Sequence, residues 1–242
     1  MSKNIIRSIK GTQDILPDQS HRWQALETAI RNTMDRYRYK EIRTPAFEHT
    51  ELFSRGVGEE TDIVSKEMYS WRDKGGENLT LKPELTAPVT RAFIQHNMGG
   101  QSPTNKLYYI AALFRRERPQ KGRYRQFHQL GVEAFGSEHP EIDSEVIALA
   151  MAVFNGIGLS NLSLKLNSIG SPQCRVDYRN ALRDFLSPHL NDLSETSLKR
   201  FEKNSLRILD TKVQHENEIN SHKHKTINQT EMTEQEVVQK EN

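Results

Sequence analysis

The sequence predicts an α+β protein that combines long helices with antiparallel strand pairs. Two apolar segments, residues 107–114 and 130–135, are rich in branched and aromatic side chains and are separated by a charged turn. This arrangement predicts a long antiparallel hairpin. Apolar residues between positions 20 and 37 recur every three or four residues, which predicts an amphipathic helix with one buried face.

The turn of this hairpin is strongly basic. Residues 115–125 contain six Lys or Arg against one carboxylate, Glu117, with Pro119 and Gly122 as turn formers. Guanidinium groups are planar forks that bind phosphate oxygens two at a time, so the hairpin suits a polyphosphate or a nucleic-acid backbone. The alternative is an ordinary solvated loop. Because Arg115 and Glu117 directly follow an apolar strand, we expect them to point into a site.

Composition limits the class of protein. The chain has 242 residues, enough for one large or two small domains, and its hydrophobic content of 35% is low for a fully packed globule. The net charge of +2 does not by itself indicate a nucleic-acid binder. Cys174 is the single cysteine, which excludes an internal disulfide and a multi-cysteine zinc cluster. Without a membrane-length apolar run or a signal-like start, a soluble, cytoplasmic protein is expected.

Shorter elements surround the hairpin. Residues 2–17 form a turn-rich lead-in before the helix, and residues 40–45 predict a short strand that proline ends. Residues 67–71 and 79–81 predict two further strands around a glycine-containing turn.

A second candidate site lies where residues 82–88, KPELTAP, join a strand to a helix. The helix is predicted to run to about Met98, with Thr86 as its N-cap. A carboxylate at this junction, Glu84, suits recognition of an ammonium group or an imidazole N–H. The alternative is that Glu84 only complements the helix dipole. With Pro83 and Thr86 beside it, we favour the site.

The remainder of the chain is predicted to be mainly helical. A helix is expected over residues 140–158 and a strand over Leu162–Leu166, followed by helical segments at 171–186 and 195–209. From Thr211 onward the residues are polar and show no sustained apolar stripe. This composition predicts a polar tail over residues 211–242 that is disordered or forms a weak, isolated helix.

The hairpin resembles a known family. Phe114-Arg115-Arg116-Glu117 matches the F-R-x-E pattern of motif 2 in class II aminoacyl-tRNA synthetases, and FRRERPQKGRYRQFHQLGVEAFG is similar to the histidyl-tRNA synthetase version. Three further segments are similar to that family: the K-G-x-x-D-x-x-P lead-in at residues 10–17, the K-P-E-x-T string at 82–86 and N-S-I-G at 167–170. Pro45 corresponds to the proline of motif 1.

The resemblance implies a fold and a domain order. The fold is the class II aminoacyl-tRNA synthetase-like mixed, mainly antiparallel sheet flanked by helices, with part of a helical insertion. Residues 1–170 would form the catalytic core with motifs 1 and 2, residues 171–210 a partial helical insertion domain, and residues 211–242 the tail. The family forms homodimers through the motif 1 region.

The resemblance also implies an activity, histidine–tRNA ligase. The substrates would be histidine, ATP with Mg²⁺, and tRNAHis. Arg115 would be the catalytic residue, and the returning strand would place Gln129 and Glu133 on one face with Gly131 between them. No metal-ligating residues are predicted. The expected binding residues are Glu84, Thr86, Gln129 and Glu133 for histidine; Arg115, Glu117, Arg123 and Phe127 for ATP; and Arg118, Gln120 and Lys121 for tRNA.

The resemblance covers roughly residues 5 to 215, which correspond to about the first half of a family member. The later R-G-[LF]-[DE]-Y-Y element, motif 3 and the anticodon-binding domain have no counterpart in the sequence. We therefore expect a fragment, a truncated product or a remodelled paralogue. Two alternatives to a ligase stay open: a synthetase-like regulatory subunit of histidine biosynthesis, and a noncatalytic RNA-binding module that uses the basic hairpin.

Overall fold

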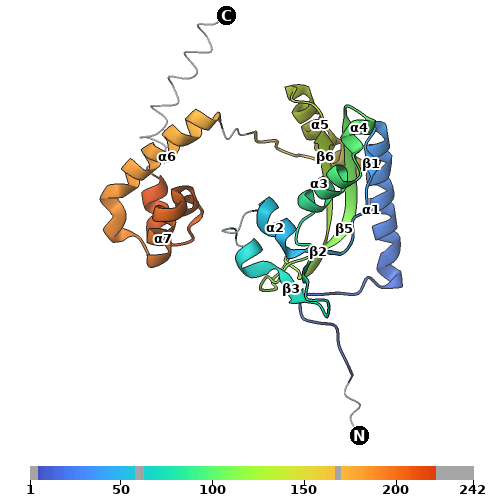
Figure 1. Ribbon diagram of the computed structural model, residues 1–242, viewed down its shortest axis with the longest axis horizontal. Helices are drawn as coiled ribbons and strands as arrows, with labels where there is room; N and C mark the ends of the chain where they lie inside the picture. Colours follow the sequence, from blue (N-terminus) through green and yellow to red (C-terminus); the bar gives the residue numbers. More distant parts are fainter. Residues whose placement is uncertain (1–4, 58–60, 62, 167–169, 222–242) are drawn as a thin grey trace, which may run out of the picture. The chain divides into compact units, whose positions relative to one another are not determined.

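The computed structural model describes residues 5–57, 61, 63–166 and 170–221. Within it the chain divides into two compact units, residues 1–162 and 163–242 (Figure 1). We describe each unit by itself.

The first unit contains the predicted long hairpin. Strand β5 (Asn105–Phe114) pairs antiparallel with β6 (Gln126–Phe135) over ten residues, from Asn105 opposite Phe135 to Phe114 opposite Gln126. The short strand β1 (Lys40–Glu41) adds to the outer edge of β5 in parallel. The sheet is therefore mixed and mainly antiparallel, which confirms the predicted class.

A smaller antiparallel sheet lies earlier in the same unit, in the order β2-β4-β3. Its strands are β2 (Phe47–His49), β3 (Tyr69–Arg72) and β4 (Asn78–Leu81). Hydroxyl groups on one face of this sheet hydrogen-bond to one another. Thr80 is fully buried, and its Oγ1 lies 2.8 Å from the hydroxyls of both Thr50 and Ser70.

Helices surround these strands. Helix α1 begins with proline, whose missing N–H costs nothing in the first turn. The helices of the first unit are α1 (Pro17–Arg36), α2 (Thr50–Val57), the π-helix η1 (Ile63–Glu67), α3 (Thr86–Gln95), α4 (Met98–Gln101) and α5 (Pro140–Gly156).

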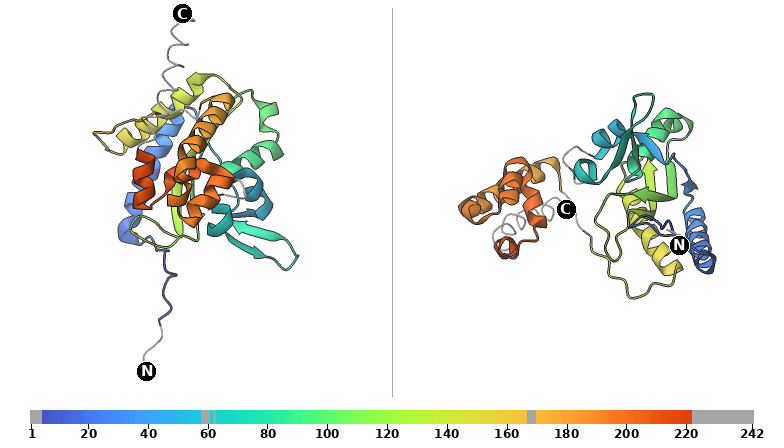
Figure 2. Two further views of the ribbon diagram at one scale, coloured as in Figure 1. Left: turned by 90° about the vertical axis from the view of Figure 1, so that its left-hand side faces the viewer. Right: turned by 90° about the horizontal axis from the view of Figure 1, so that it is seen from below.

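Alternation along β5 divides the core into two layers. Tyr108 points to one face of the sheet and packs with residues of α1 and α5, including Met34 and Leu149. Leu107, Tyr109 and Leu113 point to the other face and pack with Leu85 and Val89 at the start of α3. Figure 2 shows α1 and α5 together on one side of the strands. The face beneath α3 carries the candidate site.

The second unit is helical. It consists of α6 (Pro172–Leu186), the 3₁₀ helix η2 (Ser187–Asp192), α7 (Glu195–Asn204), the 3₁₀ helix η3 (Ser205–Asp210) and a last helical segment, residues 214–221. Its core contains the buried side chains of Leu182, Leu186, Leu193, Phe201, Ile208 and Ile219.

Two sequence predictions are wrong. Residues 211–221 do not form a loose tail: they include a helical segment and pack into the second unit, where Glu216 is 1% exposed. Leu162–Leu166 is extended but forms no strand, since no strand in the described part of the chain pairs with it. Residues 222–242 of the predicted tail and 167–169 of the N-S-I-G string lie outside the described residues.

The predicted domain boundaries at 170 and 210 differ from the division after Leu162. The assignment of the two units to a catalytic core and an insertion stays a prediction. No helix among residues 5–57, 63–166 and 170–221 is both long enough and apolar enough to cross a membrane.

Candidate active site

The site begins where β4 leaves the small sheet. The backbone N–H of Lys82 donates to Ala46 O at 3.0 Å, and the Lys82 carbonyl accepts from Phe114 N–H at 3.0 Å. The second bond comes from the last residue of β5. Lys82 therefore joins the end of the small sheet to the end of the hairpin strand, and the residues after it, Pro83 to Thr86, lie beside the start of the charged loop.

Glu84 caps helix α3. Its carboxylate accepts from the backbone N–H of Thr86 at 2.7 Å and from that of Ala87 at 3.1 Å. Thr86 is the first residue of the helix and makes no capping hydrogen bond, so its prediction as N-cap is wrong. Burial raises the pKa of Glu84 above the ordinary 4.5 and Glu133 adds to this, although both amides oppose the shift. A half-buried carboxylate that ionises at a cost favours a cationic partner.

A second carboxylate, Glu133, lies close to the first. Its Oε1 accepts a hydrogen bond from Thr86 Oγ1 at 2.8 Å and one from the Tyr109 hydroxyl at 3.4 Å. Burial first, and the charge of Glu133 second, raise the pKa of Tyr109 to about 12. The tyrosine therefore stays a neutral hydrogen-bond donor at physiological pH. Thr86 contacts both acidic residues, through its backbone and its side chain.

Gly131 leaves room between the polar residues of β6. It lies opposite Tyr109 in the sheet, and a Cβ at this position would lie 2.2 Å from the Tyr109 ring carbon Cζ and from its hydroxyl oxygen. Gln129 lies two residues away, opposite Ala111, and therefore on the same face as Gly131 and Glu133. Any side chain larger than hydrogen at position 131 would displace the tyrosine.

The basic residues form a second group at the hairpin end. The Arg115 guanidinium donates through Nε to Pro83 O at 2.9 Å and lies over the Phe127 ring, 5.2 Å from its centroid. Glu117 lies between two arginines: its Oε2 accepts from Arg123 Nη1 at 3.0 Å, and its Oε1 lies 4.0 Å from Arg115 Nη1. The carboxylate thus holds two guanidinium groups together, with Arg115 tied to the Glu84 segment.

The three residues predicted to contact tRNA lie apart from this cluster. Arg118, Gln120 and Lys121 are exposed at the hairpin end. Gln120 and Arg123 bond each other's backbones across the turn that contains Gly122, whose φ is +80°. The structure therefore brings the predicted histidine and ATP residues to one region and leaves the predicted tRNA residues free to meet a partner.

The chain is similar to known proteins. The family model described as histidyl-tRNA synthetase matches residues 11–215. This chain belongs to the histidyl-tRNA synthetase family. It is 53% identical over 207 residues to the histidine–tRNA ligase of Chloroherpeton thalassium, which covers 85% of the chain and 48% of the relative. It is also 53% identical over 211 residues to that of Listeria monocytogenes, covering 87% and 50%.

Solved structures with a similar fold include two related proteins. Apo Staphylococcus aureus histidyl-tRNA synthetase matches with a TM-score of 0.68 at 40% identity, over 84% of this chain and 48% of that one. A Bacillus halodurans protein titled ATP phosphoribosyltransferase regulatory subunit/histidyl-tRNA synthetase shares the fold, with a TM-score of 0.59 at 23% identity. The chain spans about half the length of the curated relatives it matches.

Two contributors to this candidate site are not predicted from the sequence. Tyr109 was counted only as an apolar strand residue, although alternation along β5 places it opposite Gly131 and beside Glu133. Gly11 was assigned only to the lead-in, yet it contacts the base of the charged loop. Because side chains alternate between the two faces of a strand, the paired sequences of the hairpin could have placed Tyr109 on the face of Glu133. The contact of Gly11 is long-range and has no local sequence pattern.

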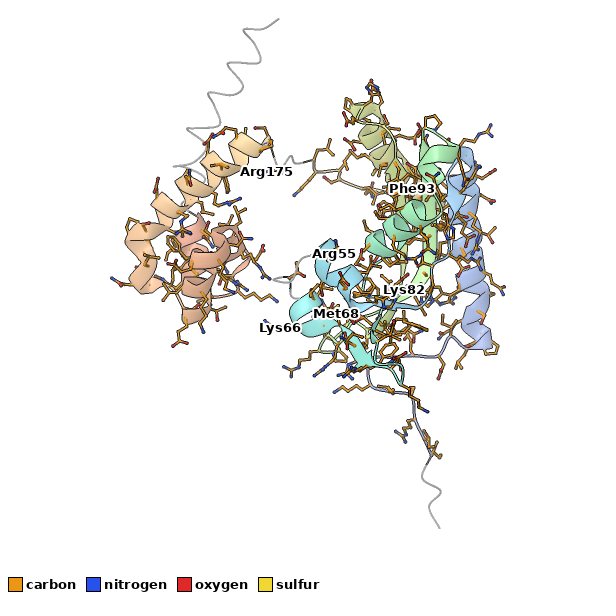
Figure 3. The ribbon with its side chains drawn as sticks, in the orientation of Figure 1. Arg55, Lys66, Met68, Lys82, Phe93 and Arg175 are labelled. Atoms are coloured by element: carbon orange, nitrogen blue, oxygen red, sulfur yellow. The ribbon has the colours of Figure 1, made fainter. Side chains whose placement is uncertain are left out.

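A cavity of about 710 Å³ lies between α2 and α3. Glu84 and Thr86 line one part of it, and Arg55, labelled in Figure 3, contributes from α2. Arg115, Gln129 and Glu133 are not among its described lining residues. The cavity therefore meets the candidate site only at the strand–helix junction, and we assign the site from hydrogen-bond geometry.

Lys82, also labelled in Figure 3, is a buried ammonium group beside this junction. It is 5% exposed, and its Nζ donates to the carbonyl of Thr44 at 3.3 Å. Burial lowers the pKa of Lys82, and the nearby Glu48 carboxylate opposes this shift. The side chain links the end of β4 to the segment that contains Pro45.

Proposed function

We propose that this chain takes part in the ATP-dependent activation of histidine and its transfer to tRNAHis. The observation that carries the proposal is the proximity of two groups: the Glu84–Thr86–Glu133 cluster, and the Arg115–Glu117–Arg123 cluster tied to it through Pro83 O. The first group suits a small cationic amino acid and the second suits phosphates. Identity of about half to histidine–tRNA ligases supports the same reaction.

In this proposal the acidic cluster binds histidine. Glu84 and Glu133 accept hydrogen bonds from the substrate ammonium and imidazole N–H groups, and Gln129 adds a polar contact from the same strand face. Their mutual repulsion, which contributes to the raised pKa of Glu84, is relieved when a cation binds between them. An amino acid without ring N–H donors would leave a buried carboxylate unpaired, which penalises the wrong substrate.

The basic cluster binds ATP. Arg115 binds the α-phosphate through its terminal nitrogens, while its Nε donates to Pro83 O and its Nη1 lies 4.0 Å from Glu117 Oε1. Arg123, which is 60% exposed, reaches the outer phosphates, and Phe127 stacks on the adenine. Glu117 holds both guanidinium groups in place. Mg²⁺ would be held largely by the ATP phosphates, as it usually is at nucleotide sites.

The reaction then follows from charge placement. A histidine carboxylate oxygen forms a bond to the α-phosphorus, the bridging oxygen to the β-phosphate leaves with the electron pair, and pyrophosphate departs. Arg115 stabilises the negative charge that develops on the α-phosphate oxygens. In the second step a ribose hydroxyl of the tRNA 3′ end attacks the activated carbonyl, and AMP leaves.

Arg118, Gln120 and Lys121 would contact the tRNA backbone from the exposed hairpin end. A noncatalytic RNA-binding module would use the same residues. In both cases, neutralising Arg118, Lys121 and Arg123 weakens tRNA binding and reduces its dependence on salt, because each phosphate contact releases counterions. Filter binding across a salt series measures this slope. A salt-independent affinity would rule out both uses of the hairpin.

The deciding experiment is histidine-dependent exchange of pyrophosphate into ATP, with Arg115→Ala as the paired variant. We expect exchange in the unmodified chain and a loss of about a hundredfold or more in the variant, comparable to removing one transition-state donor. A folded chain without exchange contradicts the ligase proposal. Histidine binding without exchange, together with co-purification of a phosphoribosyltransferase, would favour the regulatory subunit instead.

A further inference from the structure

The lead-in before α1 contains a tight turn. Thr12 donates to Ile9 O through its backbone N–H at 2.9 Å and through Oγ1 at 2.8 Å, closing a four-residue β-turn. Gly11 occupies its third position with φ of +91°, in the left-handed region that glycine adopts without cost. This turn orients the Gly11 carbonyl.

The Gly11 carbonyl binds the base of the charged hairpin loop. It accepts a hydrogen bond from Arg125 N–H at 2.7 Å and a longer one from Gln126 N–H at 3.4 Å. The contact is also tight. A Cβ on Gly11 would lie 2.8 Å from Pro119 Cγ and 2.9 Å from Arg125 Cγ. Two points of the loop, before and after its tip, therefore pack against this one glycine.

Arg125 connects this contact to the basic cluster. Its carbonyl accepts from Arg115 N–H at 2.9 Å, and its Nε donates to Glu117 O at 3.4 Å. The backbones of Arg115 and Glu117 are therefore both fixed to the residue that Gly11 holds. A shift of Arg125 would move the Arg115 guanidinium and also the carboxylate that holds Arg123.

Two apolar side chains of the lead-in contribute little to this attachment. Ile6 is 98% exposed and Ile9 is 69% exposed, so their burial does not hold the segment on the hairpin. The contacts that the structure describes between this segment and the hairpin loop are the backbone bonds and close packing at Gly11. This contact is the reason to assign the glycine more than the general role of a turn former.

We infer that Gly11 is a positioning residue for the phosphate-binding loop, acting through Arg125 on Arg115 and Glu117. The inference rests on the proposed function for its ligand, MgATP, and on geometry alone for its effect on the loop. The inference predicts different effects of Gly11 on the affinities for the two substrates. Histidine binding depends on Glu84 and Glu133, which Gly11 does not contact.

The test compares Gly11→Ala with Gly158→Ala in the full chain. Gly158 has φ of +84° and no atom within 4 Å of an added Cβ, so its variant carries the same backbone strain without a collision. For Gly11→Ala we expect faster amide hydrogen exchange in residues 113–127, with β5 and β6 outside this range unchanged. Calorimetry is expected to show MgATP binding weakened about tenfold or more and histidine binding unchanged.

Thr12→Ala provides a second variant, since it removes one of the two turn bonds without touching the hairpin. It should shift the same measurements in the same direction by less. Loop exchange in Gly11→Ala equal to that in Gly158→Ala overturns the inference. Faster loop exchange with unchanged MgATP affinity overturns it also. If the unmodified chain binds no MgATP, the proposed function fails, and the exchange comparison alone decides the positioning role.

Discussion

The carboxylate of Glu84 bonds to the amides of helix α3 and also lies near a second carboxylate, Glu133. It accepts hydrogen bonds from the amides of Thr86 and Ala87, as an ordinary helix cap would, and yet burial raises its pKa. A carboxylate used only as a cap needs no second carboxylate nearby. Glu133 is close enough to add to the shift, and this pairing is what distinguishes a cation site from a helix cap.

A substitution at this residue tests the cation site. Glu84→Gln keeps a hydrogen-bond acceptor for the helix but removes the charge, so the KM for histidine should rise about tenfold or more, the value of a charged hydrogen bond. Pyrophosphate exchange measures it. Thermal unfolding should change little. An unchanged KM would show that Glu84 only caps α3.

The raised pKa of Glu84 also sets a pH dependence. Just above the ordinary glutamate pKa of 4.5, the folded protein holds a proton that the unfolded chain has lost. The contribution of this group to the free energy of unfolding therefore falls as pH rises through that window. Histidine affinity should move the opposite way, rising with pH as the carboxylate ionises. In Glu84→Gln both pH effects of this group should be absent, which calorimetry at several pH values can check.

The candidate site at Glu84 can be predicted from local sequence because the residues that form it are adjacent. A carboxylate between a strand and a helix, next to Pro83 and Thr86, predicts a site from adjacent residues alone. The cap itself was assigned to the wrong side chain, since the pattern does not show which oxygen reaches the free amides. Tyr109 was missed for a related reason: its partner Glu133 is 24 positions away, and only the strand register brings them together.

At the scale of elements, the β5–β6 hairpin needs a glycine at position 131, because a side chain there would collide with Tyr109. Gly131→Ala places a methyl group 2.2 Å from the Tyr109 ring, so the ring must move away from Glu133. We expect a loss of about 1–3 kcal/mol in the free energy of unfolding from overpacking, with weaker histidine binding. Denaturant unfolding and calorimetry measure these effects. Gly156→Ala is the matched control, because its nearest neighbour, Thr33 Oγ1, is 3.6 Å away and alanine favours a helix.

In the second unit, Glu216 anchors the helical segment 214–221. Its carboxylate accepts from Ser194 N–H and Ser197 Oγ, both at 2.7 Å, and from Thr211 Oγ1. Burial opposes ionisation of Glu216, but these hydrogen bonds prevail and lower its pKa to about 2. The difference from the ordinary value of 4.5 corresponds to about 3 kcal/mol of stability at neutral pH.

Replacing Glu216 with Gln should therefore destabilise the second unit at pH 7. The difference from the unmodified chain should shrink as pH falls from 4.5 towards 2, since the native carboxylate is then protonated as well. Circular dichroism of the helical signal during thermal unfolding measures the destabilisation at pH 7 and its decrease at lower pH. Equal stability of the two proteins at pH 7 would show that the hydrogen bonds of this carboxylate only offset its burial.

Two segments, residues 214–221 and 162–166, show where hydropathy patterns fail to predict structure. Residues 214–221 are mostly polar, and their packing depends on one acidic side chain that three hydroxyl or amide donors satisfy, which no apolar stripe reveals. Leu162–Leu166 shows the opposite failure, an apolar pattern that predicts an element which does not form. It alternates like a half-buried strand, but a strand also needs a neighbour with free hydrogen-bonding groups. The hairpin 107–136 was predictable because both of its strands and its turn are adjacent in sequence.

For the whole molecule, the exposed aromatic pair on the small sheet bears on assembly. Phe47 is 49% exposed and Trp71 is 40% exposed, and their rings lie 6.0 Å apart. Phe47 lies two residues after Pro45, which corresponds to the proline of motif 1. We propose that the chain forms a homodimer through this region. Phe47→Asp should then lower the sedimenting mass by half at concentrations where the unmodified chain is dimeric.

Val176→Asp serves as the control for that experiment, since Val176 is similarly exposed, at 46%, on helix α6 of the second unit. It should leave the mass unchanged. A monomeric unmodified chain across the concentration range would contradict the dimer, and dissociation by both variants would place the contact elsewhere.

The extended segment Leu162–Leu166 has a consequence for handling the protein at high concentration. Its three leucines are 38%, 52% and 69% exposed, and Lys165 is its one charge. An extended, apolar segment that pairs with no strand in the described part of the chain is a template on which further chains can add as strands. Aggregation of this chain is therefore expected to start at residues 162–166, and a second charge at position 164 should slow it.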